Sequence, residues 1–188
     1  MLLNIIRHFI KICKHKHYVR QYCWKIGLYK RGLLHDLSKF SPIEFLESAK
    51  YYQGHSSPID KCKAVNGYSK AWLHHKGRNT HHYEYWVDGC DGGGKPLEMP
   101  YEDVAEMVCD FLGAGKAYMG HHFTYNQELK WWQERKKNNP NMLIHPNTKD
   151  FISQILLELT FSNENNILNK KHFKYIYNTI HNQKCKEC

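Results

Sequence analysis

Residues Gly32–Phe40 read GLLHDLSKF and place a histidine and a carboxylate directly after an apolar run. A buried aspartate without a cation costs several kcal/mol, so Asp36 requires a positive partner if it is buried. A metal ion would supply that charge. The alternative is a helix end at which His35 and Asp36 face water. Residues elsewhere in the sequence distinguish between these two interpretations.

Composition is compatible with one globular domain. The chain has 188 residues, of which 41% are hydrophobic, and a formal net charge of +9. This charge favours anionic partners such as phosphorylated small molecules, nucleotides in particular, or nucleic acid. No run approaches the length of a membrane span, so we expect no membrane association. The seven cysteines are widely spaced and follow no signal peptide, which predicts reduced thiols and a cytoplasmic location. The Cys185-x-x-Cys188 pair has no second pair beside it, and we interpret it as part of a frayed tail.

Apolar periodicity predicts an all-α fold. Between residues 3 and 26 apolar side chains recur at three- and four-residue steps, and Gly27 follows as a helix end. His15 shares the inward face of this helix, whereas His17 lies about 200° around it. We therefore expect one of the two to face inward, and we favour His15.

Further helices follow along the chain. Ser41, Pro42 and Glu44 predict a capped helix start, and residues 54–68 predict a loop. Helices are also expected near 71–77, after Pro100, at 129–137, after His145 and around 173–180. Residues 77–100 are irregular and contain a glycine run that we interpret as a flexible loop, without strand pairs. We predict a single-domain helical bundle, with residues 1–162 as the metal-binding part and 163–188 as a Lys-rich C-terminal helix or tail.

Histidines and aspartates recur beside the apolar elements. In chain order they are His15, His35-Asp36, His74-His75, His81-His82 and Asp110. Imidazole and carboxylate ligands together suit divalent Mn, Fe, Co, Ni or Zn better than Ca. His35 and Asp36 would project about 100° apart on a helix. They can still meet at one ion across the helix end, or bridge two ions.

This order resembles the HD-domain metal-dependent phosphohydrolase superfamily. His15, His35-Asp36 and Asp110 match its ligand order, and WLHHKGRNTHH at residues 72–82 resembles the additional histidines of members that bind two metals. Within the two pairs we favour His75 by position and His82 on resemblance alone. Residues 8–160 also resemble a family of uncharacterised bacterial and phage proteins, for which no activity is established.

The resemblance implies a helical bundle of the HD-domain type that hydrolyses a nucleotide-like phosphoester at one or two metal ions. Asp36 would act in catalysis as a ligand, and Lys39 and Arg78 would pair with the phosphate. Two other functions stay open. One is a di-iron oxygenase of similar fold, and the other is a non-catalytic, metal-stabilised regulatory or nucleic-acid-binding module. The substrate, the metal and the oligomeric state are not determined by the sequence.

Overall fold

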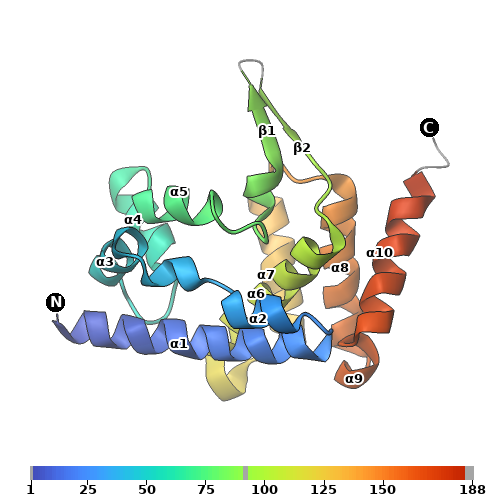
Figure 1. The fold of residues 1–188 in the computed structure, drawn as a ribbon, viewed down its shortest axis with the longest axis horizontal. Helices are drawn as coiled ribbons and strands as arrows, with labels where there is room; N and C mark the ends of the chain where they lie inside the picture. The colour runs from blue at the N-terminus through green and yellow to red at the C-terminus, as the bar shows by residue number, and fades with distance from the viewer. Residues whose placement is uncertain (1, 91–92, 185–188) are drawn as a thin grey trace.

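The computed structural model describes residues 2–90 and 93–184 (Figure 1). Within these residues the regular secondary structure is helical except for one two-stranded sheet, so the all-α prediction is confirmed. The α-helices are α1 (Leu2–Lys25), α2 (Tyr29–Leu34), α3 (Pro42–Lys50), α4 (Pro58–Asn66), α5 (Lys70–Lys76), α6 (Tyr101–Met119), α7 (Tyr125–Asn138), α8 (Pro146–Phe161), α9 (Glu164–Ile167) and α10 (Lys170–Lys184). Short 3-10 helices are η1 (Leu37–Phe40), η2 (Tyr83–Trp86) and η3 (Gly120–His122), and the strands are β1 (Val87–Cys90) and β2 (Gly93–Pro96).

Helix α1 runs along the molecule and packs against α6, and this pairing positions the site (Figure 1). The two helices approach closely where Val19 of α1 meets Gly113 of α6. A Cβ atom at Gly113 would lie 2.4 Å from Val19 Cγ2 and 2.9 Å from the Val19 backbone nitrogen. Val19 is completely buried. Only glycine permits this separation, which brings the inward faces of α1 and α6 together.

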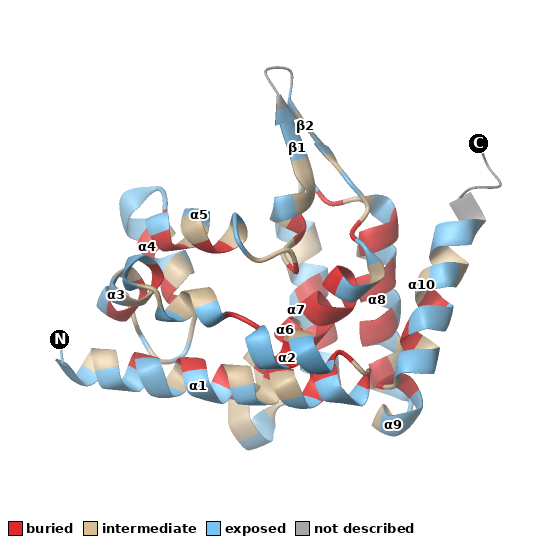
Figure 2. Cartoon of the chain, in the orientation of Figure 1, coloured by how far each residue is buried: buried red, intermediate tan, exposed pale blue. Residues whose placement is uncertain are grey.

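Helices α6 and α8 contribute more buried residues than the other described helices (Figure 2). Phe151 of α8 and Phe173 of α10 are both buried and contact each other edge to face. Trp132 of α7 is fully buried in the same core and donates a hydrogen bond to Ser153 Oγ. The final helix, which the Phe173 and Ile176 spacing predicts, therefore packs into the same core as the helices before it.

Two segments differ from the sequence predictions. Residues 58–66, expected within a loop, form α4, which begins at Pro58 and ends before Gly67 at φ 79°. Its buried residues are Pro58 and Cys62, so the apolar repeat is too weak to detect. Residues 87–90 and 93–96, in a segment expected to contain no strand pair, form two antiparallel strands in which Val87 pairs with Pro96 (Figure 1). Glycine-rich strands lack the β-branched residues and the alternation by which strands are recognised.

Among the described residues, no helix combines the length and apolar character needed to cross a membrane. Cys185 and Cys188 lie outside the described residues.

Candidate metal centre

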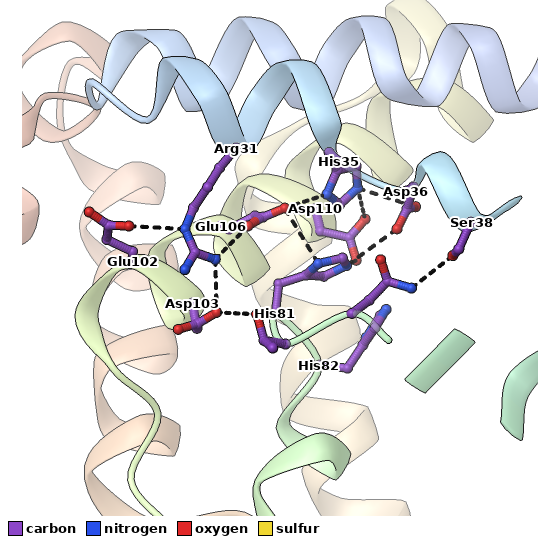
Figure 3. Close-up of polar contacts among 12 residues, drawn as sticks. Arg31, His35, Asp36, Ser38, His81, His82, Glu102, Asp103, Glu106 and Asp110 are labelled. Atoms are coloured by element: carbon purple, nitrogen blue, oxygen red, sulfur yellow. Dashed lines mark hydrogen bonds and ion pairs between the residues drawn. The ribbon is translucent and has the colours of Figure 1, made fainter. Parts of the chain in front are cut away.

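The predicted ligand residues meet in a buried cluster between α1, α6 and the link from α2 to η1 (Figure 3). His15, His35, Asp36 and Asp110 each offer a ligand atom, and these four atoms all lie within 4.8 Å of one another. His15 Nε2 is 3.0 Å from Asp110 Oδ1 and 3.3 Å from Asp36 Oδ2. Two carboxylates and two imidazoles thus face a common point, as metal ligands do.

A second group of ligand atoms lies on the other side of Asp36. It consists of Asp36, His75, His81 and His82, again with all ligand atoms within 4.8 Å. Asp36 Oδ1 is 3.3 Å from His75 Nε2 and 3.4 Å from His81 Nε2. Its other oxygen, Oδ2, lies 3.2 Å from His35 Nε2. The Asp36 carboxylate therefore directs one oxygen to each group, which is the arrangement of a bridging ligand.

Two further carboxylates orient the histidines from behind. Glu106 Oε1 lies 2.9 Å from His35 Nδ1, and Glu44 Oε2 lies 2.7 Å from His75 Nδ1. Because an ionised carboxylate only accepts, each Nδ1–H donates, and Nε2 is the ring nitrogen that faces the cluster and would bind a metal ion in its deprotonated form. A carboxylate behind the histidine is the usual support of a metal-bound imidazole.

Arg31 of α2 holds one of these supporting carboxylates in place. Its Nη1 donates to Glu106 Oε2 at 2.9 Å and to Asp103 Oδ1 at 2.8 Å (Figure 3). Glu106 therefore contacts Arg31 with one oxygen and His35 with the other. The ion pairs fix α2 against α6, and this fixes the position from which His35 enters the cluster.

The backbone at His35 and Asp36 explains how adjacent residues reach the same cluster. On a continuous helix His35 and Asp36 would project about 100° apart, but α2 ends at Leu34, and Asp36 adopts the left-handed conformation with φ 55°. This φ is uncommon for a residue other than glycine. The reversal turns both side chains inward, whereas Leu33 and Leu34 are about half exposed. Burial of the pair is therefore caused by α1 and α6, not by its apolar neighbours.

Opposite charges dominate the electrostatics. Burial raises the pKa of Asp36, but His35, Lys39 and His75 lower it well below its usual value. Burial likewise raises the pKa of Asp110, and hydrogen bonds from His15 and His35 lower it well below normal. Burial lowers the pKa of His35, yet Asp36 and Asp110 raise it well above normal. Without a metal, the cluster therefore retains protons on imidazole that a divalent cation would replace.

The donor atoms fit a metal ion. Asp36 Oδ1 and His81 Nε2 are both buried and neither has a hydrogen-bond partner among the described residues, although they lie only 3.4 Å apart. Buried polar atoms without partners are costly, and a cation between two lone pairs would satisfy both. The nitrogen and oxygen donors suit the same divalent transition metals that the sequence indicates.

All six predicted ligand residues are brought together by the structure. His15 is buried whereas His17 is exposed, as the helix periodicity indicates. Lys39 Nζ lies 2.5 Å from Asp36 Oδ2, so this predicted phosphate contact is at the cluster. Arg78 is exposed and does not line the cavities beside the cluster. The structure does not bring Arg78 to the site.

Three residues of the cluster were missed by sequence reasoning. His81, passed over in favour of His82, is 3% exposed; it belongs to the group with Asp36 and to a third possible ligand group with His35 and Glu106. Glu106 lies four residues before Asp110, and this spacing predicts that the two side chains share one face of the helix. Glu44 was predicted to complete a capping box, but the Ser41 side chain makes no cap hydrogen bond, and Glu44 binds His74 and His75 instead.

Two cavities lie beside the cluster. The smaller, about 210 Å³, is lined by residues that include His15, Lys39, His75 and Asp110. The larger, about 470 Å³, is lined by aromatic side chains such as Trp72 and Trp131 together with charged ones such as Lys63 and Arg135. Both are lined by His82, together with Ser57, Ile59, Trp72, Ala114 and Tyr118. The candidate ligands thus form one wall of a space large enough for a small molecule.

Fold and site together define a helical protein with a buried histidine–carboxylate cluster able to hold metal ions. The chain belongs to the DUF5662 family, a family of unknown function whose model matches residues 4–158. This range includes every residue of the cluster. Comparison with curated proteins found no match, and comparison with solved structures found none either.

Proposed function

We propose that this protein is a metal-dependent phosphohydrolase with a dinuclear centre bridged by Asp36. The single observation that carries the proposal is the Asp36 carboxylate, whose two oxygens face two separate groups of imidazoles. One ion would be held by His15, His35, Asp36 and Asp110, and the other by Asp36, His75, His81 and His82. The order of these residues also resembles that of the HD-domain phosphohydrolases, to which we assign the protein as part of this proposal.

The metal ions would supply an activated water and neutralise charge on the phosphoryl oxygens. The residues of the chain would position the metal ligands. Glu106 and Glu44 hold His35 and His75 with their Nε2 atoms toward the cluster. Burial of the cluster limits the access of water, and the lower local dielectric strengthens each charge interaction with a bound anion.

Lys39 is the cation that we assign to the substrate. Burial lowers the pKa of Lys39, but Asp36 and Asp110 raise it above its usual value, so the ammonium stays charged. It lines the smaller cavity together with Lys11. Once metal ions neutralise the Asp36 carboxylate, the Lys39 ammonium is free to pair with a phosphate oxygen. This cation beside the cluster favours phosphate chemistry over the di-iron oxygenase and over a non-catalytic module.

The test is phosphate release from a panel of nucleotides, cyclic nucleotides and short oligonucleotides, with Mn, Co, Ni, Mg or Fe added separately. We expect turnover with at least one metal. Asp36→Ala should abolish both metal binding and turnover, and Lys39→Ala should retain the metal while lowering turnover. Oxygen consumption by the iron-loaded protein without phosphate release would instead identify an oxygenase. Bound metal with neither activity would identify a binding module.

A matched pair of variants on α1 controls for nonspecific effects. His15 and His17 are two residues apart on one helix, but only His15 is buried in the cluster. We expect His15→Ala to lose metal and turnover, and His17→Ala to retain both. Equal loss in the two variants would contradict the assignment of His15 as a ligand.

A further inference from the structure

Glu128 of α7 is a buried acid that the proposed metal chemistry does not use. It is 6% exposed and lines the larger cavity. Its carboxyl makes no hydrogen bond or ion pair with any residue in the described part of the chain. The carboxyl borders the cavity, so a ligand bound there would meet an acid that has no partner among the described residues.

The structure makes room for this carboxyl by means of a glycine. A Cβ atom at Gly115 of α6 would lie 2.2 Å from Glu128 Oε2 and 2.6 Å from Phe123 Cε2. The carboxyl group therefore occupies the space that a side chain on α6 would fill. Burial raises the pKa of Glu128 to about 8, and the Asp110 charge adds to this effect. At neutral pH the group is mostly a neutral acid that can donate one hydrogen bond and accept another.

Several aromatic side chains contribute to the walls of the cavity that Glu128 lines. Trp72, Tyr83, Phe111 and Trp131 line the cavity, so a flat organic group has rings to pack against. Two aromatic faces already have cations over them: Lys63 Nζ is 4.7 Å from the Trp72 ring centroid, and Arg135 Cζ is 5.5 Å from that of Trp131. The carboxylates Asp60 and Glu84 line the same cavity, and Glu84 lies 3.6 Å from Arg135, so the charges of the wall offset one another. The cavity volume of about 470 Å³ is suited to a neutral planar group.

We propose that the larger cavity binds a planar heterocycle with a lactam edge, in which an N–H stands beside a C=O, and that Glu128 recognises this edge by two hydrogen bonds. The His82, Trp72 and Tyr118 walls shared by the two cavities would let the attached phosphoester reach the metal centre. That connection rests on the proposed function, whereas recognition of the heterocycle does not. Glu128 acts here as a substrate-recognition residue.

The experiment compares inosine, which has the lactam edge, with 1-methylinosine, in which a methyl group replaces the N–H hydrogen. Binding is measured by calorimetry and by quenching of tryptophan fluorescence, since Trp72 and Trp131 line the cavity. We expect at least tenfold weaker binding of 1-methylinosine, in keeping with the loss of one hydrogen bond to a buried group. Similar affinities for the two nucleosides, or no inosine binding at millimolar concentration, would overturn the proposal. This comparison requires no substitution in the protein.

Variants then test Glu128 itself. Glu128→Gln keeps a donor and an acceptor and should keep the preference for inosine, whereas Glu128→Leu should abolish it with an unchanged circular dichroism spectrum. Persistence of the preference in Glu128→Leu would refute the role of Glu128.

The nucleosides contain no phosphate, so their binding should be equal in EDTA and with metal added. Lactam selectivity without phosphate release would leave this inference standing and refute the proposed hydrolysis. Phosphate release without lactam selectivity would support the proposed hydrolysis and refute the role of the larger cavity in lactam recognition.

Discussion

The buried Glu128 carboxyl predicts a specific dependence of stability on pH. Burial and Asp110 raise its pKa from 4.5 to about 8 in the native state. Between these two values the native protein keeps a proton that the unfolded chain releases. Stability from this group is therefore fully present below pH 4.5 and is lost as the pH rises toward 8. At 1.36 kcal/mol per pKa unit, the loss is about 5 kcal/mol at most.

Glu128→Gln removes the titration while keeping the shape of the side chain. We expect the free energy of unfolding of the variant, minus that of the wild type, to increase by up to about 1.4 kcal/mol per pH unit between pH 5 and pH 8. The measurement is urea denaturation of both proteins in EDTA across this range. Histidines titrate in both proteins and cancel in the difference. A difference that does not change with pH would refute the inference that Glu128 is protonated when folded.

Three other predictions concern the cluster and the helix pair that supports it. Excess EDTA should lower the melting temperature of metal-loaded protein, because binding to the native state stabilises it; an unchanged curve after verified metal loss would contradict a buried site. Gly113→Ala should cost roughly 1–3 kcal/mol in urea denaturation, because its Cβ would overlap Val19. Arg31→Met should lower metal affinity about 10- to 100-fold in a competition titration by releasing Glu106, which supports His35; unchanged affinity would show that this support is dispensable.

Helical periodicity was sufficient wherever one helix face is buried along its length. In α1 the apolar repeat correctly predicted that His15 faces inward and His17 outward. Gly27, with φ 79°, follows the end of α1, as the sequence predicts. These features depend on neighbours within a few residues, which is the range over which a single sequence is informative.

Features that depend on distant contacts were not predictable in this way. The reversal at Asp36 is stabilised by residues of α1 and α6 that are far away in the sequence. Glu44 looked like a local cap because its partners, His74 and His75, lie some thirty residues further on. His81 and His82 are adjacent, and both enter the cluster, which no local rule predicts.

The central claim is a dinuclear metal centre bridged by Asp36. Its most direct test is anomalous X-ray diffraction from crystals of the untagged protein grown with Mn. The account predicts two anomalous peaks on opposite sides of the Asp36 carboxylate, one beside His15 and Asp110 and the other beside His75 and His81. A map with no peak at Asp36, from protein crystallised with saturating metal, would contradict the account.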